Sequence, residues 1–313
     1  MKYKIHCLSL LLVGVLLFAS CQRELVVDID FNEELLVLNG VLVTDSAPVD
    51  ITITKMKSLN DTADFDFVDN KIVCLYANNE LLGTMQYADS GHYQMDVAPR
   101  GGVTYKIEVK QESGKMVWAE TTVPEKVPVL FEMDTIITPT QGGYNDFDPI
   151  FQFTINDNPG TTDYYWFAIQ VLRTSRTEEW YAPIFMYTTS PFIDDFSSAY
   201  DMAEEPPYNV EYGYFARFPD TQFNGENCLI DFFNKYDSGY FRVFGFSFDE
   251  SYDRYFKLAL KYSDYRSMIE DLPLYYQPSF IYSNVQNGTG IVGSMAVFSQ
   301  KLYFSTNDLV IEE

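Results

Sequence analysis

Apolar and polar residues alternate along much of the chain with the two-residue period of a β-strand. Residues 49–55 (VDITITK) and 104–110 (TYKIEVK) show the pattern most clearly, and such alternation is typical of strands with one buried face. Turn signals rich in Asn, Asp and Gly separate the strands at intervals of about 8–12 residues, as in antiparallel sandwiches. Residues 32–124 are therefore predicted to form an N-terminal β-sandwich of the immunoglobulin or fibronectin type.

Strand patterns resume after residues 123–129 (VPEKVPV), which carry two prolines and are predicted to form a linker. Residues 125–313 are predicted to form a second β-rich domain, also of sandwich type. Within it, residues 174–227 show no clear period and contain five prolines, so a long irregular excursion is expected there. Near the end of the chain, residues 291–297 and 301–305 are expected to form two further strands.

One segment has the spacing of a helix rather than that of a strand. Acidic residues open the segment 249–268, and apolar side chains recur there at i, i+3 and i+4, which indicates an amphipathic α-helix. The apolar positions are Tyr252, Tyr255, Phe256, Ala259 and Leu260. The predicted fold class is therefore mainly all-β, with two sandwich domains and one helix.

The N-terminus has a different pattern, a basic start followed by an unbroken apolar run. Residues 1–20 are predicted to be a secretory signal peptide, with Lys2 and Lys4 before the apolar stretch and small residues at its end. The run is shorter than the roughly 20 residues of a spanning helix. The sequence FASC ends at Cys21 and has the form of a bacterial lipobox. We therefore expect Cys21 to carry acyl chains such as palmitate, and residues 21–31 to form a tether; the alternative is an ordinary signal peptide with a chance cysteine.

Composition narrows the choice of partners. The chain has 45 Asp and Glu against 21 Lys and Arg, a formal net charge of −24. Nucleic-acid binding requires clustered Lys and Arg, so nucleic acid is excluded as a partner. The same argument excludes flat binding to an anionic membrane surface, which leaves the lipid as the tether. Aromatic residues make up 17% of the chain, which is typical of β-rich cores and cross-strand packing.

Two cysteines, Cys74 and Cys228, remain outside the signal peptide and the lipobox. An exported protein could pair them in a disulfide bond. They lie in different predicted domains, however, and free cysteines are commonly buried as small apolar residues. Two free thiols are therefore expected rather than a disulfide.

The residue types that most enzymes need are scarce. His92 is the only histidine after residues 1–20, so a histidine-based zinc centre is excluded and a serine triad would depend on this one residue. His92 lies in a predicted turn between Gly91 and Tyr93, which favours a structural role. The chain has no P-loop or dinucleotide-binding motif, and neither a cofactor nor a metal is expected.

Paired carboxylates are the remaining catalytic candidates, because glycoside hydrolases need only two acidic side chains. Such pairs are expected by chance in a chain with 45 acidic residues. The pairs are Asp146 with Asp148, Glu178 with Glu179, Asp194 with Asp195, and Glu204 with Glu205. The loops 61–69 and 157–163 offer oxygen ligands for calcium, but neither has EF-hand spacing. Both are therefore expected to be solvated acidic loops.

Several segments spread over almost the whole chain match one family in their order and spacing. They are Cys21 with its lipobox, LLVLNGVLV at 35–43, SGHYQMDVAPRGGVTYKIEV at 90–109, TTVPEKVPV at 121–129, FQFTINDNPGTTDYYWFAI at 151–169, FPDTQFNGENCLIDFF at 218–233, the helical segment at 249–268, and SNVQNGTGIVGSM at 283–295. On these segments the chain resembles the outer-membrane lipoproteins of Bacteroidota grouped as domain of unknown function 4249 (DUF4249). Residues 174–217 depart from the usual pattern of the family.

The resemblance implies a partner rather than a reaction. Genes of this family tend to lie beside genes for TonB-dependent outer-membrane receptors, and such receptors often work with lipoproteins that capture or hand over nutrients. The leading hypothesis is therefore a non-enzymatic outer-membrane lipoprotein that is accessory to a TonB-dependent receptor in nutrient capture or uptake. The resemblance brings no catalytic residues with it. The sequence leaves open whether the protein faces the periplasm or the cell surface.

Contact with a ligand or receptor is assigned to aromatic residues of the excursion, because exposed aromatic side chains stack on sugars and anchor interfaces. The candidates are Trp180, Tyr181, Phe185, Tyr187, Phe192 and Tyr200. The competing interpretation is that these side chains pack onto the second sandwich. Two alternative functions stay open: an adhesin-like or structural cell-surface module without a small ligand, and a glycan hydrolase that uses a carboxylate pair.

Overall fold

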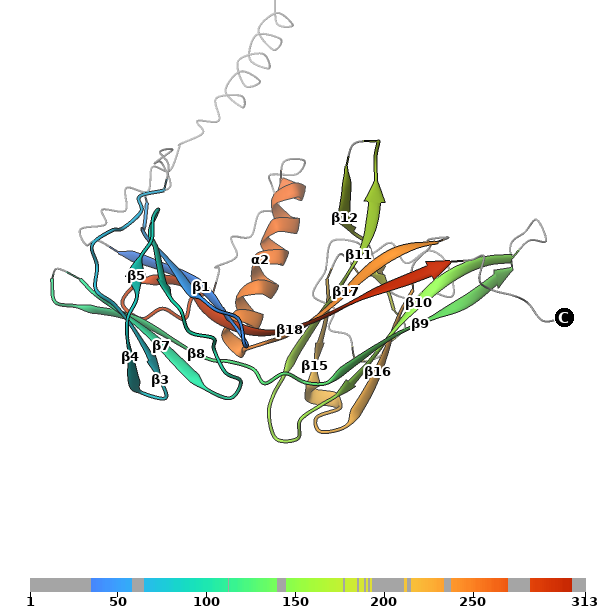
Figure 1. The fold of residues 1–313 in the computed structure, drawn as a ribbon, viewed down its shortest axis with the longest axis horizontal. Helices are drawn as coiled ribbons and strands as arrows, with labels where there is room; N and C mark the ends of the chain where they lie inside the picture. The colour runs from blue at the N-terminus through green and yellow to red at the C-terminus, as the bar shows by residue number, and fades with distance from the viewer. Residues whose placement is uncertain are drawn as a thin grey trace, which may run out of the picture.

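The structure is a computed structural model of the chain, shown in Figure 1. It describes residues 35–57, 65–111, 113–139, 145–176, 178–184, 186–188, 190, 192, 211–212, 215–233, 238–269 and 282–305. The described residues form eighteen β-strands, a short 3₁₀ turn η1 (Asp220–Gln222) and one α-helix. The prediction of a mainly β fold is therefore confirmed.

Two sheets enclose the core of the N-terminal half. One has four strands in the order β4-β3-β7-β8, and the other is the β1-β2-β6-β5 part of a nine-stranded sheet. The strands are β1 (Leu36–Val43), β2 (Val49–Lys55), β3 (Val73–Ala77), β4 (Glu80–Thr84), β5 (Gln86–Tyr87), β6 (His92–Met95), β7 (Thr104–Lys110) and β8 (Met116–Thr122). The alternating residues point inward as predicted, and Ile51, Ile53 and Ile107 are fully buried between the sheets. Each such side chain contributes about 1.5–3 kcal/mol.

The C-terminal half repeats this arrangement with a core of aromatic side chains. The rest of the nine-stranded sheet, in the order β12-β11-β17-β18 with β15 on β11, packs on a sheet of order β14-β13-β16-β10-β9. The strands are β9 (Val129–Pro139), β10 (Asn145–Asn156), β11 (Tyr164–Thr174), β12 (Glu179–Pro183), β13 (Met186–Tyr187), β14 (Glu211–Tyr212), β15 (Ala216–Pro219), β16 (Asn227–Phe233), β17 (Ser238–Phe248) and β18 (Thr289–Ser305). Phe153 lies at the centre, 4.8 Å from the Phe167 ring and 5.2 Å from the Phe232 ring between centroids.

One long strand, β18, joins the two halves. Residues 289–295 pair in parallel with β1, and residues 295–305 pair antiparallel with β17. Figure 1 shows this strand crossing from one half to the other. β18 therefore crosses the predicted domain division after residue 124, because this C-terminal strand pairs with β1 in the sheet of the N-terminal half. The two strands expected at 291–297 and 301–305 are parts of this single strand.

Asparagines and glycines of the segment SNVQNGTGIVGSM allow β18 to lie against β1. Asn284 accepts a hydrogen bond from the Val292 N–H at 3.1 Å and donates one to the Val292 carbonyl at 2.8 Å. Gly290 has a φ of +107° and lies so close to β1 that a Cβ would meet the Leu38 carbonyl oxygen. An L-residue with a side chain is strained at such a φ. The segment therefore has a structural role, because it allows β18 to pair with β1 and so to connect the two halves.

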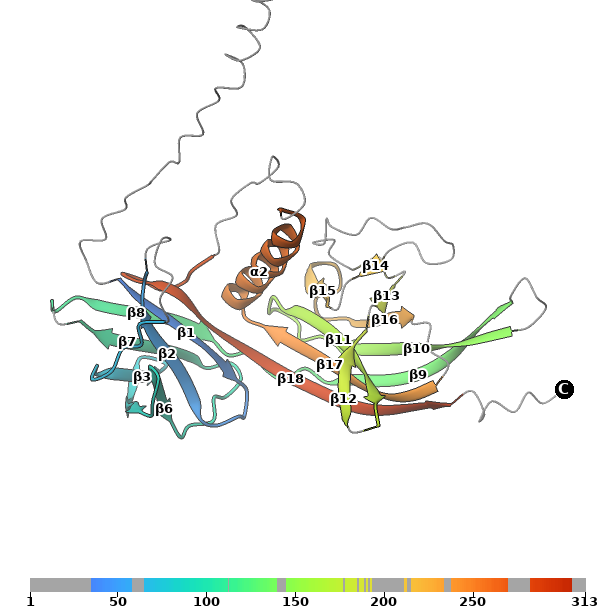
Figure 2. The same ribbon diagram turned by 90° about the horizontal axis from the view of Figure 1, so that it is seen from above.

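The helix α2 (Glu250–Ile269) begins one residue after the predicted start and confirms that prediction. It lies on the outer face of the nine-stranded sheet, as Figure 2 shows. Tyr252, Phe256 and Leu260 pack against Trp166 and Phe248 of the sheet. These three residues belong to the apolar face that the sequence predicts.

Other expectations have mixed outcomes. The excursion at 174–227 is partly regular, because it contains β12 to β15, and β15 pairs with β11. Cys74 and Cys228 are both free thiols, as expected, although Cys74 is only half-buried. The helical part of the described chain offers no stretch with both the length and the apolar character needed to span a membrane.

Candidate functional site

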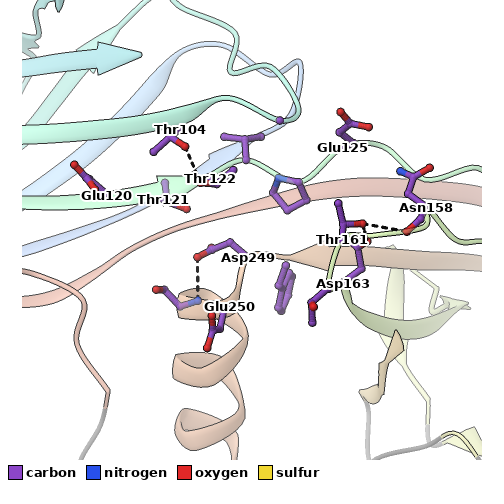
Figure 3. A pocket seen from close by; sticks show the side chains of 16 residues that line it. Thr104, Glu120, Thr121, Thr122, Glu125, Asn158, Thr161, Asp163, Asp249 and Glu250 are labelled. Atoms are coloured by element: carbon purple, nitrogen blue, oxygen red, sulfur yellow. Dashed lines mark hydrogen bonds between the residues drawn. The ribbon is translucent and has the colours of Figure 1, made fainter. Parts of the chain in front are cut away.

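A cavity of about 490 Å³ lies where the two halves meet (Figure 3). Three segments far apart in the sequence supply most of its walls: residues 120–125 at the end of β8, residues 158–163 before β11, and residues 248–251 between β17 and α2. Cavities of about this size commonly hold small ligands, and they occur preferentially at domain interfaces. This cavity is therefore the candidate functional site.

Eleven of the sixteen residues that line the cavity carry a carboxylate or a hydroxyl group. Glu120, Glu125 and Glu250 are exposed there, Asp163 is buried and Asp249 is half-buried. Five threonines and Ser251 also line the cavity, and the described lining residues include no Lys, Arg or His. The cavity therefore presents hydrogen-bond acceptors and negative charge to a ligand.

Asp249 ties three elements together at the cavity. Its Oδ1 accepts a hydrogen bond from the Ser294 N–H of β18 at 2.6 Å, and its Oδ2 accepts one from the Ser251 N–H of α2 at 3.0 Å. The second bond makes Asp249 the N-cap of the helix. The Ser294 hydroxyl lies 2.7 Å from the Thr121 hydroxyl of β8. Burial raises the pKa of Asp249 to about 6, although its hydrogen bonds act in the opposite direction.

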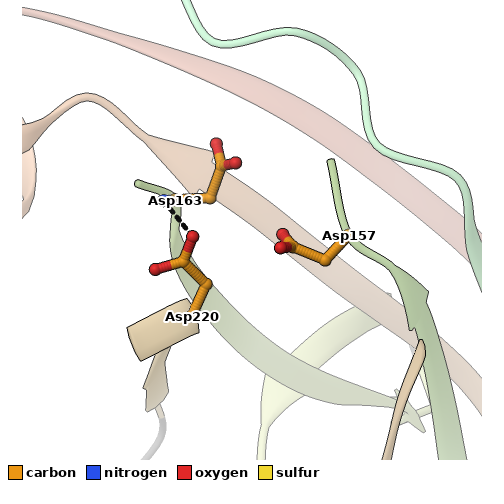
Figure 4. A group of neighbouring side chains, drawn as sticks. All are labelled: Asp157, Asp163 and Asp220. Carbon is orange, nitrogen blue, oxygen red and sulfur yellow. Dashed lines mark hydrogen bonds between the residues drawn. The ribbon is translucent and has the colours of Figure 1, made fainter. Parts of the chain in front are cut away.

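Three buried aspartates form a cluster that shares Asp163 with the cavity (Figure 4). Asp157 follows β10, Asp163 precedes β11, and Asp220 begins η1. Each offers a carboxylate oxygen, and these oxygens lie within 4.8 Å of one another. Asp220 is only 1% exposed. The expectation of a solvated loop at 157–163 is therefore wrong for its two aspartates, because the segment around η1 folds over them.

Hydrogen-bond donors surround the cluster. The donors are Tyr165 Oη, Gly225 N, Thr161 Oγ1, Ser247 Oγ, Asp163 N and Asn224 Nδ2. Every carboxylate oxygen of the three aspartates accepts a hydrogen bond except Asp220 Oδ1, which is buried without a partner. An oxygen buried in this way costs about 1–3 kcal/mol.

The hydrogen bonds satisfy most of these oxygens but do not cancel their charge. Burial raises the pKa of Asp163 and of Asp220, and the neighbouring carboxylates raise both pKa values further. An oxygen-only donor set is what a hard cation such as calcium prefers. Asp157, Asp163 and Asp220 are thus the described residues best placed to hold such an ion. Protonation of the carboxylates is the alternative way to neutralise the charge of the cluster.

A buried ion pair fixes α2 on the sheet beside the cavity. Arg217 of β15 donates to both carboxylate oxygens of Asp253, at 2.7 Å through Nε and 2.8 Å through Nη2. The Trp166 indole N–H donates to the same carboxylate at 2.8 Å. Both charged side chains are less than a tenth exposed. The sequence does not predict this pair. A helical pattern is recognised from its apolar residues, so it gives no sign that the charged Asp253 also lies on the buried face.

Trp180, Tyr181 and Phe192, the aromatic candidates whose side chains the structure describes, do not line the cavity. Trp180 and Tyr181 are on the edge strand β12; Trp180 is 47% exposed, whereas Tyr181 lies under the Arg242 guanidinium, 4.0 Å from the ring centroid. Phe192 packs against Phe223, with 5.6 Å between ring centroids. Exposure of Trp180 agrees with a contact role, and the place of Phe192 agrees with the packing interpretation.

Of four further predicted residues, one is placed through its backbone alone and three are not described. The backbone of Tyr187 belongs to β13. Phe185, Tyr200 and the lipidation residue Cys21 lie outside the described residues. None of the placed aromatic candidates lines the cavity.

The polar candidates are also dispersed. His92 lies at the start of β6, and its Nδ1 is 3.0 Å from Asp50 Oδ1, in agreement with a structural role. Glu178 and Glu179 are exposed near β12, and Asp146 and Asp148 belong to β10. The pairs Asp194 with Asp195 and Glu204 with Glu205 lie outside the described residues, as does part of the loop 61–69. None of the placed acidic pairs lines the cavity.

Fold and cavity define the class of this protein: a mainly β protein of two packed halves, joined by one strand, with an acidic cavity between them. The sequence profile of the family described as Domain of unknown function (DUF4249) matches residues 22–301. The chain therefore belongs to this family, as its resemblance predicts. No curated protein matches the chain.

Proposed function

We propose that this protein is a non-enzymatic lipoprotein, anchored to the outer membrane through Cys21, that assists a TonB-dependent receptor by holding a ligand in the cavity between its two halves. The cavity is the observation that carries the proposal. It has the volume of a small-molecule site, and its walls come from both halves. The adhesin-like alternative requires no such cavity.

The anchor rests on the sequence. The lipobox ending at Cys21 follows a signal-like segment, and the polar residues after it provide a tether to the folded part. One acyl chain binds a membrane only weakly, whereas two or more anchor stably. A lipidated Cys21 would therefore hold the cavity within reach of a membrane partner.

The edge strand β12 is our candidate for contact with the receptor. Trp180 projects there with about half of its surface exposed. An edge strand presents unpaired backbone groups to a partner, and tryptophan is enriched among residues that dominate binding energy. Ligand and receptor would thus use different parts of the molecule.

The test is recovery of the receptor with the tagged protein from detergent-solubilised outer membranes. We expect a TonB-dependent receptor to copurify with the wild type. We expect Trp180→Ala to reduce recovery, whereas Tyr303→Ala, which removes another exposed aromatic side chain, leaves it unchanged. In Cys21→Ser, the protein should leave the membrane fraction. Absence of any receptor from the wild-type preparation would contradict the proposal.

A further inference from the structure

The cavity between the two halves carries negative charge that no basic lining residue offsets. Glu120, Glu125 and Glu250 border it, and the described lining residues include no cationic side chain. Lys126 follows Glu125 in the chain but is directed elsewhere, with its Nζ 2.9 Å from Asp45 Oδ2. The nearest cation along the chain is therefore engaged outside the lining.

Glu120, Glu125 and Glu250 are exposed and carry this charge. The neighbouring Asp163 and Asp220 do not need to contribute, because burial disfavours their charged forms. A concave site lined by one sign of charge focuses the electrostatic potential and concentrates ligands of the opposite sign. An anionic ligand would instead bring a like charge against several carboxylates, which opposes binding.

We infer that the ligand of this cavity is positively charged and carries primary amines, as a lysine-containing peptide does. The inference rests on the proposed function, in that the cavity holds a ligand. An ammonium group has three N–H donors and no acceptor, and it therefore matches a lining of carboxylates and threonine hydroxyls. Glu125 and Glu250 lie on different walls of the cavity (Figure 3), so one ligand with several amines can contact both halves.

The test is calorimetric titration of the full protein with a trilysine peptide that is capped at both ends. The comparison peptide has the same length with all three lysines acetylated, which removes their charge. We expect the trilysine peptide to bind at least tenfold more tightly than the acetylated peptide. Added salt should weaken its binding, because exposed charges are screened.

Two double variants locate the site. Glu125→Gln with Glu250→Gln removes two charges from the cavity, and we expect it to weaken trilysine binding at least tenfold. Glu132→Gln with Glu178→Gln removes two charges from exposed positions outside the cavity and should change binding less than twofold. All four side chains are exposed, so both proteins should fold.

Three results would overturn the inference: no binding of trilysine to the wild type, equal binding of the acetylated peptide, or equal weakening by the two double variants. The last result would assign binding to the overall negative charge. Recovery of the receptor from membranes is measured separately. Failure of the ligand assignment is therefore distinguishable from failure of the proposed function.

Discussion

One half-buried carboxyl, that of Asp249, connects the helix, the long strand and the cavity. Its oxygens accept the N–H groups of Ser294 and Ser251, which lie on different elements. The same burial that makes these hydrogen bonds strong disfavours the negative charge. The stability of the junction therefore depends on pH through this residue.

The pH dependence has a definite sign. The pKa of Asp249 is about 6 in the folded protein and near 4 in an unfolded chain, so the folded state binds this proton more readily. The cost of ionising the buried group is present above about pH 6 and is lost as the pH falls toward 4. Lowering the pH from 7 to 5 should add on the order of 1 kcal/mol to the free energy of unfolding through this group.

Urea unfolding of the wild type and of Asp249→Asn at pH 5 and pH 7 measures this contribution. The variant should be less stable at both pH values, because an amide replaces one of two accepting oxygens. Its free energy of unfolding should also increase less between pH 7 and pH 5 than that of the wild type, because the Asp249 carboxyl is absent. Asp45→Asn, which changes an exposed aspartate, serves as the control and should keep the gain. An unchanged pH dependence in Asp249→Asn would contradict the assignment.

The ion pair of Arg217 with Asp253 makes a second prediction at this scale. Arg217→Met leaves the Asp253 carboxylate buried beside the Trp166 indole N–H but without its cationic partner. It should cost about 3–5 kcal/mol of unfolding free energy. Combining it with Asp253→Leu should cost less, because no charge then stays buried.

The exposed pair of Lys126 with Asp45 provides the comparison, and Lys126→Met should cost less than about 1 kcal/mol. Chemical denaturation, followed by tryptophan fluorescence, measures these differences. The proteins compared are the wild type, Arg217→Met, the double variant Arg217→Met with Asp253→Leu, and Lys126→Met. A double variant less stable than Arg217→Met would show that the pair itself, rather than an isolated charge, is what the fold requires.

Among the elements, those that pack against one partner layer were predictable and the connecting strand β18 was not. The strand at 49–55 buries one face, and the apolar residues Tyr252, Phe256 and Leu260 of the helix face the sheet. β18 instead changes partner at Met295, from β1 to β17. Its pattern of buried positions therefore follows two environments, and the sequence suggests two strands.

Contact between α2 and β18 depends on the absence of a side chain at Gly293. A Cβ there would lie 2.5 Å from the Cβ of Tyr252, which is too close for both atoms. Gly293→Ala should therefore push the helix from the sheet, at a cost of roughly 1–3 kcal/mol. Thermal unfolding and limited proteolysis of the helix measure the effect.

Gly114→Ala is the matched control. An added methyl group at Gly114 meets no atom within 4 Å, although its φ of +84° disfavours alanine by about 1 kcal/mol. Only Gly293→Ala should increase cleavage within α2. Equal cleavage in the two variants would contradict close packing of the helix on β18.

At the scale of the whole molecule, the cavity could not be predicted from sequence. Asp163 and Asp249 lie on separate segments of the C-terminal half, and Glu120 comes from β8 of the N-terminal half. No local sequence pattern indicates that these residues lie close together. They are brought together by the pairing of β18 with strands of both halves. The segments FPDTQFNGEN and NDNPGTTD carried polar residues that could have suggested a common site, but only the fold places Asp220 beside Asp157.

The shared strand makes the two halves dependent on each other. Residues 32–124 alone would leave β1 as an open edge and would remove Val285 and Val292 from the core. We expect this segment alone to lack a cooperative unfolding transition, and a peptide of residues 283–297 to restore one. Circular dichroism during heating checks both. A segment that unfolds cooperatively without the peptide would contradict the dependence.

The central claim is that the cavity between the halves is where this protein binds its ligand. Hydrogen–deuterium exchange of the full protein, with and without the capped trilysine peptide, tests the claim most directly. We predict slower exchange in residues 120–125, 158–163 and 248–251, which supply the walls of the cavity. Protection confined to other surfaces such as β12, or no protection at a peptide concentration that saturates binding, would contradict it.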